Sequence, residues 1–222
     1  MNCLTKSYLN VKGYMWLFFI VISLIFIIFP QIDLLVASFF YNGKSFPLNG
    51  TLVESFFYYS VKPVIIGFVL LTVIIYFYNK ITKKNILNIT SKTIFYIMLV
   101  VGIAPGLIVN TTLKEHWGRP RPMQVKEFGG KLEFTPAFIM SKQDGYSFSS
   151  GHTAAAFSLM GFALLAHKRR RFWLSLTIVY GVAVSLARMA AGGHFLSDVV
   201  TSFFIVWIFT HLFYKLIFKE EI

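Results

Sequence analysis

Apolar residues along this chain fall into six runs, which are separated by shorter polar segments. A helix needs roughly 20 residues to cross about 30 Å of hydrocarbon, and lipid offers an unpaired backbone group no hydrogen-bond partner. We therefore predict an all-α polytopic membrane protein with six transmembrane helices, over residues 14–29, 58–78, 93–113, 153–166, 172–187 and 195–218. A long polar loop separates the third predicted span from the fourth.

Composition supports a membrane protein. Hydrophobic residues make up 56% of the 222 residues and charged residues 14%, whereas soluble domains carry roughly 25% charged residues. No repeat or low-complexity tract divides the chain, so we expect a single integral membrane domain over residues 1–222. Lys6 and Lys12 precede the first apolar run, as in a signal peptide. No Ala-x-Ala-like cleavage site follows, so we expect this run to remain as a helix.

The basic residues predict the orientation, because short cytoplasmic loops are rich in lysine and arginine. With six spans, one side of the membrane receives Lys6, Lys12, Lys80, Lys83, Lys84, Lys92, Lys168, Arg169, Arg170, Arg171, Lys215 and Lys219. We predict that this side is cytoplasmic. The net charge of +12 is then explained by anionic lipid headgroups. A nucleic-acid partner is not expected, because it would need a basic face on a soluble surface.

Three polar clusters lie on the opposite side. The first is the segment LKEHWGRPRP, which holds Lys114, Arg119 and Arg121. Its prolines restrict the backbone and so fix where the arginines point. A guanidinium grips phosphate through two parallel hydrogen bonds, and lysine adds a compact charge. The cluster therefore favours a phosphate site, although a basic interfacial loop has the same composition.

The second cluster is the segment YSFSSGHTAAAF, where the fourth apolar run begins. The start of a helix presents free N–H groups to an anion, and Gly151 allows a ligand to approach the backbone closely. Ser150 has two interpretations, since serine is also a common N-cap residue. His152 titrates near neutral pH and is a candidate proton donor. A single interfacial histidine is also common as a packed polar residue.

The third cluster is the segment ARMAAGGHFLSD. Arg188 follows the fifth apolar run, and His194 and Asp198 are four residues apart, hence on one helical face. Asp198 is the only acid placed inside a predicted span, where a carboxylate is costly and usually functional. A carboxylate that accepts one imidazole N–H leaves the other ring nitrogen free as a nucleophile. A buried structural His–Asp pair is the alternative.

The predicted topology brings the ends of spans three and five to the same face as the starts of spans four and six. The polar residues that can meet there are Lys114, Arg121, Ser150, Gly151, His152, Arg188, His194 and Asp198. Cys3 is the only cysteine, and no Asp/Glu cluster suited to magnesium is present. We therefore expect neither a metal ion nor another cofactor.

These motifs resemble those of the type 2 phosphatidic acid phosphatase superfamily, which also includes glucose-6-phosphatases and vanadium haloperoxidases. Its pattern is Lys, six residues, Arg-Pro; then Pro-Ser-Gly-His; then Ser-Arg, five residues, His, three residues, Asp. The spacings from Lys114 to Arg121 and from Arg188 to Asp198 agree with it. Ser149 stands where proline is usual and Ala187 where serine is usual. Neither departure removes a catalytic group.

The resemblance implies a role for each matching residue. His194 would attack phosphorus and form a phosphohistidine, Asp198 would orient it, and His152 would protonate the leaving oxygen. The phosphate oxygens would be held by Lys114, Arg121, Ser150, Gly151 and Arg188. The spacing assigns the phosphate contact to Arg121, so replacing Arg119 should be the milder of the two changes. Phosphoryl transfer depends mainly on positioning and on stabilising charge, which this set of residues supplies.

The long loop and the segment before it are similar to bacterial lipid A phosphatases. We therefore expect a lipid phosphatase that removes the 1- or 4′-phosphate of lipid A. The expected location is the bacterial inner membrane, with the site facing the periplasm or outer leaflet. Alternatives are a phosphatidylglycerophosphate or undecaprenyl diphosphate phosphatase, a lipid phosphotransferase, and a non-enzymatic lipid-binding or transport protein. The expected partners are the lipid substrate and the bilayer. The sequence does not indicate an oligomeric state.

Overall fold

The computed structural model of the protein describes residues 7–8, 11–166 and 168–219. Cys3 and Lys6 lie outside these residues. A short antiparallel hairpin, β1 (Ser7–Tyr8) and β2 (Val11–Lys12), precedes a chain of helices. The helices are α1 (Gly13–Ile28), α2 (Gln31–Ser38), α3 (Leu52–Thr82), η1 (Ile86–Asn88), α4 (Ser91–Val101), η2 (Gly102–Leu113), α5 (Lys114–His116), η3 (Pro122–Gln124), η4 (Lys126–Phe128), α6 (Gly151–Ser158), α7 (Met160–Leu165), α8 (Arg170–Ala190) and α9 (Leu196–Phe218).

The prediction of an all-α membrane protein is confirmed, but six full spans are not. Within the described ranges, four helices are long and apolar enough to cross a membrane: Leu52–Thr82, Ser91–His116, Arg170–Ala190 and Leu196–Phe218. A fifth candidate is the pair α1 and α2, which bends by 87°. Pro30 stands at this bend, where it lacks the N–H that would continue the first helix. The predicted fourth span corresponds to the shorter apolar helix Gly151–Leu165.

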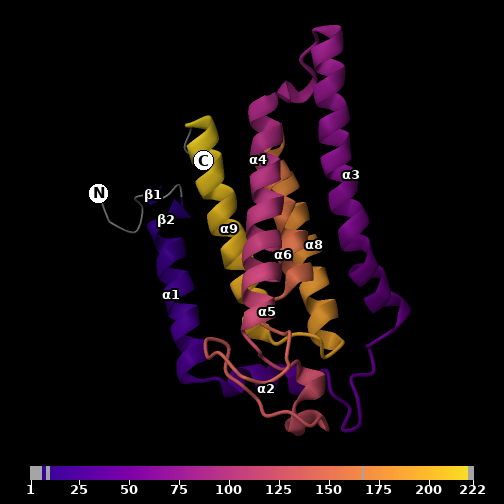
Figure 1. Cartoon of the computed structure of the whole chain (residues 1–222), viewed down its shortest axis with the longest axis vertical. Helices are drawn as coiled ribbons and strands as arrows, with labels where there is room; N and C mark the ends of the chain where they lie inside the picture. Colours follow the sequence, from indigo (N-terminus) through magenta and orange to yellow (C-terminus); the bar gives the residue numbers. More distant parts are fainter. Residues whose placement is uncertain (1–6, 9–10, 167, 220–222) are drawn as a thin grey trace.

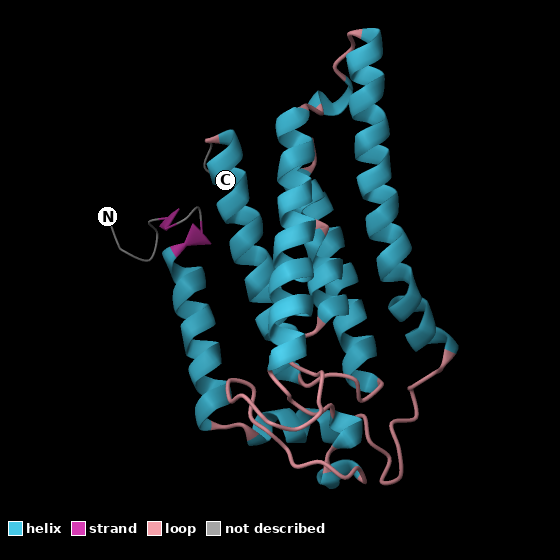
Figure 2. Ribbon diagram, viewed as in Figure 1, coloured by secondary structure: helices cyan, strands magenta, loops and turns pink. Residues whose placement is uncertain are grey.

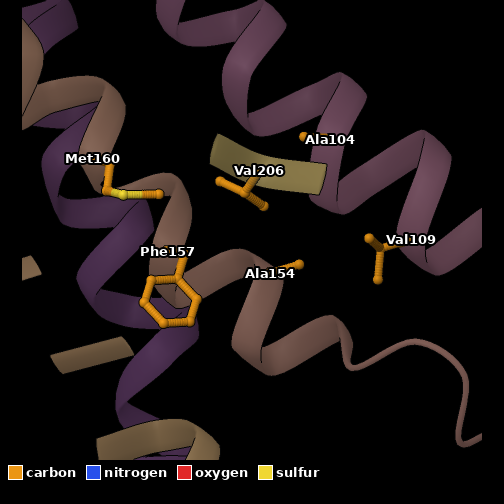
Figure 3. Close-up of a cluster of buried hydrophobic side chains, with 6 residues drawn as sticks. All are labelled: Ala104, Val109, Ala154, Phe157, Met160 and Val206. Carbon is orange, nitrogen blue, oxygen red and sulfur yellow. The ribbon is translucent and has the colours of Figure 1, made fainter. Parts of the chain in front are cut away.

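The short helix pair α6 and α7 lies in the middle of the bundle. α6 packs against α3, α8, α9 and η2. Its small residues permit this close approach, and Ala154 and Ala156 are fully buried. Figure 3 shows one of the resulting clusters, in which η2, α6, α7 and α9 contribute Ala104, Val109, Ala154, Phe157, Met160 and Val206. Because protein surrounds this helix, the thickness of the bilayer does not set its length.

Large apolar side chains cover the outer faces of the bundle. On α3, for example, Leu70, Leu71 and Ile74 are exposed, as expected for side chains that face lipid. Figure 1 shows the long helices side by side, with α2 lying across one end of the bundle. The loop between α5 and α6 lies at this same end, and Figure 2 shows the coil gathered there. The end that carries α2 therefore contains the starts of α3, α6 and α9 and the end of α8.

Candidate active site

The predicted site residues come together at the end of the bundle that carries α2. Lys114 begins α5, Gly151 opens α6, Arg188 lies in the last turn of α8, and Asp198 lies in the first turn of α9. His152 lies within electrostatic range of Arg188, His194, Lys114 and Arg121. Lys114 in turn lies within range of Arg121 and Arg188. The convergence expected from the topology is therefore present in the structure.

The start of α6 forms one wall of this site. Ser150 is the N-cap, and its Oγ accepts a hydrogen bond of 3.4 Å from the backbone N–H of Thr153. A side chain in place of Gly151 would collide with the side chain of Asn110. Ser149 is fully buried and its hydroxyl has no hydrogen-bond partner. The capping interpretation of Ser150 thus agrees with the structure, and Gly151 is required by close packing.

Tyr58, near the start of α3, joins His152 to Arg188. The His152 ring stacks on the Tyr58 ring with centroids 4.1 Å apart and an interplanar angle of 27°. The Arg188 guanidinium carbon lies 4.7 Å from the centroid of the same ring. An aromatic face attracts a cation and provides a flat support for an imidazole. Tyr58 therefore fixes the positions of two predicted site residues.

Arg188 retains an unused donor at the site. Its Nη1 lies 2.6 Å from Oε1 of Glu54, and only 8% of the residue is exposed. Its Nε is buried and has no hydrogen-bond partner. Gly193 leaves room for this guanidinium, because a side chain there would collide with Nη2. A buried arginine with a free N–H is suited to receive an anionic oxygen.

Glu54 should be needed to hold Arg188 in place. We expect Glu54→Ala to lower kcat/KM for a synthetic lipid phosphate about tenfold, a loss of about 1.4 kcal/mol. The reason is that the guanidinium would lose its fixed orientation and its buried counter-ion. The matched control is Glu133→Ala, which breaks an exposed ion pair with Lys126 and should leave kcat/KM unchanged. Equal values for Glu54→Ala and the unmodified protein would contradict this role.

His194 is buried, and a backbone carbonyl fixes its tautomer. Its Nδ1 lies 2.8 Å from the carbonyl oxygen of Ser147 and 3.7 Å from Oδ2 of Asp198. Because a carbonyl only accepts, Nδ1 carries the proton and Nε2 keeps its lone pair. Burial lowers the pKa of His194, while Asp198 acts in the opposite direction. The Asp198 carboxylate lies beside the same ring nitrogen that the sequence assigns to it, and the Ser147 carbonyl is the nearer of the two acceptors.

Asp198 is fully buried and receives hydrogen bonds from three directions. Its Oδ2 accepts from Oγ of Ser147 at 2.6 Å and from the backbone N–H of Phe195 at 2.8 Å. Its Oδ1 accepts from Nη1 of Arg119 at 2.5 Å. These donors stabilise the ionised carboxylate beside the His194 ring. Asp198 therefore stands next to the imidazole as a fixed negative charge.

Sequence reasoning missed several of these residues. Arg119 was placed outside the motif, yet it is fully buried and ion-paired to Asp198. The motifs also give no indication of four further residues at the site, Asp33, Glu54, Tyr58 and Ser147. A signal was available for two of them, since Asp33 and Glu54 are two of only nine acids in a chain of net charge +12. The predicted second span begins at residue 58, whereas α3 begins at Leu52, so Glu54 lies on the helix and not in the preceding loop.

The described ranges hold no group of three or more His, Cys, Asp or Glu side chains that could bind a metal ion. The charge at the site instead comes from the basic side chains of Lys114, Arg121 and Arg188, which lie within electrostatic range of one another. Together with the start of α6, they form a cationic site around two imidazoles. Such a site can bind a phosphate group and place it against a histidine.

Comparison with known proteins agrees with this chemistry. The PAP2 superfamily model matches residues 93–222. A lipid A 4′-phosphatase of Francisella tularensis subsp. novicida (strain U112) is 33% identical over 206 residues, covering 88% of this chain and 90% of that protein. A lipid A 4′-phosphatase of Rhizobium leguminosarum is 40% identical over 101 residues, 44% of this chain and 43% of that protein. Phosphatidylglycerophosphatase B of Escherichia coli (strain K12) is 32% identical over 88 residues, 37% of this chain and 35% of that protein.

No solved structure matches the chain. The family model nevertheless includes all three polar clusters, from Lys114 to Asp198, and the relative from Francisella is similar over nearly its whole length. The resemblance that the motif spacings indicated is confirmed, including its likeness to bacterial lipid A phosphatases. The chain therefore belongs to the PAP2 superfamily, and it is a multi-pass membrane enzyme that hydrolyses phosphoric monoesters.

Proposed function

We propose that this enzyme removes the 4′-phosphate of lipid A. The observation that carries the proposal is the 33% identity to a lipid A 4′-phosphatase over 88% of this chain. This similarity favours the 4′-phosphate over the 1-phosphate, the two positions left open by the sequence. The cationic site at the end of the bundle supports the proposal, because a lipid can keep its acyl chains in the bilayer while its phosphate reaches Arg121 and Arg188.

The proposed mechanism runs through a phosphohistidine. Nε2 of His194 attacks phosphorus, the bond to the sugar oxygen breaks, and His152 gives that oxygen a proton. Water then gives a proton to His152 and attacks phosphorus, the bond from phosphorus to Nε2 breaks, and inorganic phosphate leaves the free imidazole. The phosphate oxygens are held by the basic side chains and by the backbone at the start of α6, namely Lys114, Arg121, Arg188, Ser150 and Gly151. The unpaired Nε of Arg188 supports this assignment.

We further propose six membrane crossings, with the site on the periplasmic side of a bacterial inner membrane. Successive segments alternate between the two ends of the bundle (Figure 1). The segment between α7 and α8 lies at the end opposite to the site, because the Arg170 guanidinium carbon is 5.9 Å from the ring of Tyr214 near the end of α9. α6 and α7 would then make one crossing inside the protein. The basic residues of that end fit a cytoplasmic surface.

A substrate panel tests the proposal. Purified protein is incubated with bisphosphorylated lipid A, phosphatidylglycerophosphate and undecaprenyl diphosphate, and released phosphate is measured. We expect the highest kcat/KM for lipid A, with mass spectrometry showing loss of the 4′-phosphate alone. Loss of the 1-phosphate instead would overturn the assigned position. Preference for phosphatidylglycerophosphate would favour the activity named for the Escherichia coli relative, and phosphate found on a lipid hydroxyl would indicate a transferase.

A further inference from the structure

Three buried charged side chains, those of Asp33, Arg119 and Asp198, connect α2 to the site. Nη2 of Arg119 lies 2.7 Å from Oδ2 of Asp33, and its Nη1 lies 2.5 Å from Oδ1 of Asp198. Asp33 is 1% exposed, and the other two residues are fully buried. Ser197 is hydrogen-bonded to this group of charges. Its Oγ donates to Oδ2 of Asp33 at 2.5 Å, and its N–H donates to Oδ1 at 2.9 Å.

Both carboxylates of this buried group of charges accept several hydrogen bonds. Asp33 accepts hydrogen bonds from Arg119 and from two groups of Ser197. Asp198 accepts from Arg119, from the Ser147 hydroxyl and from the Phe195 backbone. The hydrogen bonds from Arg119 and from the backbone N–H groups of Ser197 and Phe195 favour the ionised form of both carboxylates. One guanidinium against two carboxylates leaves one surplus negative charge, next to His194.

We propose that Asp33 preserves the charge of Asp198 by occupying the other side of Arg119. Without Asp33, Arg119 would neutralise Asp198, and the pair would carry no net charge. With Asp33 present, the three residues together carry one negative charge. Oδ2 of Asp198, which shares this charge, lies 3.7 Å from Nδ1 of His194. Asp33 is thus a positioning residue that acts through Arg119 and does not touch the substrate. It also lies outside residues 93–222, which the family model matches.

The inference rests on the proposed nucleophilic role of His194. When Nε2 bonds to phosphorus, the electron pair of the broken P–O bond leaves with the sugar oxygen, which takes the proton of His152. The phosphorylated ring keeps its proton on Nδ1 and carries a positive charge. The surplus negative charge offsets this new charge in a buried site, where Coulomb interactions are strong. Asp33 therefore favours formation of the phosphohistidine.

Several other charged groups face the His194 ring. From α8 comes Arg188, from the loop after α5 comes Arg121, and from α6 comes His152. Glu54 of α3 is ion-paired to Arg188, which is one of these groups. The two arginines favour a neutral imidazole, whereas Asp198 favours its cation. The surplus negative charge on Asp33, Arg119 and Asp198 therefore opposes the effect of these arginines on the charge of the His194 imidazole.

The test is the pH dependence of kcat/KM in Asp33→Asn. The acid limb of this profile reports the ionisation of the free enzyme's base, here His194. We expect Asp33→Asn to lower kcat at least tenfold with little change in KM. The acid limb should move to lower pH by about one unit, because a negative charge near the imidazole is lost. Ionisation of the substrate affects both proteins equally and cancels in the comparison.

Two further variants separate charge from structure. Ser197→Ala removes the hydroxyl hydrogen bond to Asp33 but keeps the backbone N–H bond and every charge, so its acid limb should stay in the position of the unmodified protein. Asp33→Asn combined with Arg119→Gln leaves Asp198 as an uncompensated negative charge. This double variant should bring the acid limb back toward the unmodified position. A purely structural role predicts instead that the double variant is worse in every respect.

An unchanged acid limb in Asp33→Asn would overturn the proposal. If that variant does not fold, Asp33→Ser is measured in its place. Failure of both neutral variants and of the double variant to fold would show that Asp33 serves the fold alone. Failure of the proposed mechanism looks different. In that case His194→Ala keeps its activity, whereas an inactive His194→Ala beside a normal profile for Asp33→Asn refutes only the role of Asp33.

Discussion

His194→Ala should release no measurable phosphate from any lipid phosphate, a loss on the order of 10⁴-fold or more in kcat. The structure gives the reason, because Nε2 of His194 is the free ring nitrogen of a buried imidazole whose Nδ1 donates to Ser147. Alanine removes this nucleophile and leaves the cationic side chains in place. Substrate binding should therefore survive while turnover is lost.

Rapid quenching with radiolabelled substrate gives the decisive measurement. The unmodified protein should yield an acid-labile, base-stable phosphoenzyme, and His194→Ala should yield none. The matched control is His116→Ala, since His116 is exposed at the end of α5 and its Nδ1 lies 3.0 Å from the backbone carbonyl of Thr112 in η2. That variant should keep full activity. Full turnover in His194→Ala, with the protein folded, would rule out a phosphohistidine on this residue.

Arg119→Ala should be the most destabilising arginine replacement in the site region. It would leave Asp33 and Asp198 as two buried carboxylates without a counter-ion. Breaking a buried pair by removing one partner costs about 3–5 kcal/mol, and the whole stability of a domain is only about 5–15 kcal/mol. We expect little folded protein, so for stability Arg119 should be the more sensitive of the two arginine positions.

Arg121→Ala is the matched comparison. Arg121 is partly exposed, and its side chain lies near Lys114, His152 and Arg188. We expect a normal thermal unfolding midpoint and a fall in kcat/KM of about 10²–10³-fold, as when one oxyanion donor is removed. The midpoints are measured in detergent by intrinsic fluorescence, beside the activity. A normal unfolding midpoint in Arg119→Ala would contradict the predicted cost of removing this buried counter-ion.

The helices and their meeting point could be predicted from the sequence, because hydrophobic runs long enough to cross a bilayer have few alternatives to a helix. Alternation of the ends then brings Lys114, Gly151, Arg188 and Asp198 together. The number of full spans could not be predicted. Whether an apolar segment such as 151–165 faces lipid or protein depends on its neighbours, and hydropathy is the same in both cases.

The residues that hold the site residues in position could not be predicted from the sequence either. Arg119 and Arg121 occupy similar positions in the segment GRPRP, yet one is fully buried and the other is partly exposed. What separates them is contact with Asp33, which lies 86 positions earlier in the chain. Residue type and spacing identify groups that suit phosphate chemistry. They do not identify the distant partner that orients each group, because tertiary packing decides that.

The shortness of the central helix has a consequence for how a substrate arrives. At about 1.5 Å per residue, Gly151–Leu165 is about 22 Å long, whereas the hydrocarbon layer is about 30 Å thick. If the far end of this helix lies at the edge of the hydrocarbon layer, beside the basic segment before α8, its start falls short of the other edge. The two imidazoles near that start then lie several ångströms below the bilayer surface on the side of the site. A lipid whose acyl chains hold it in the bilayer can reach that depth by lateral diffusion. A phosphate ester dissolved in water would have to lose its hydration to reach it.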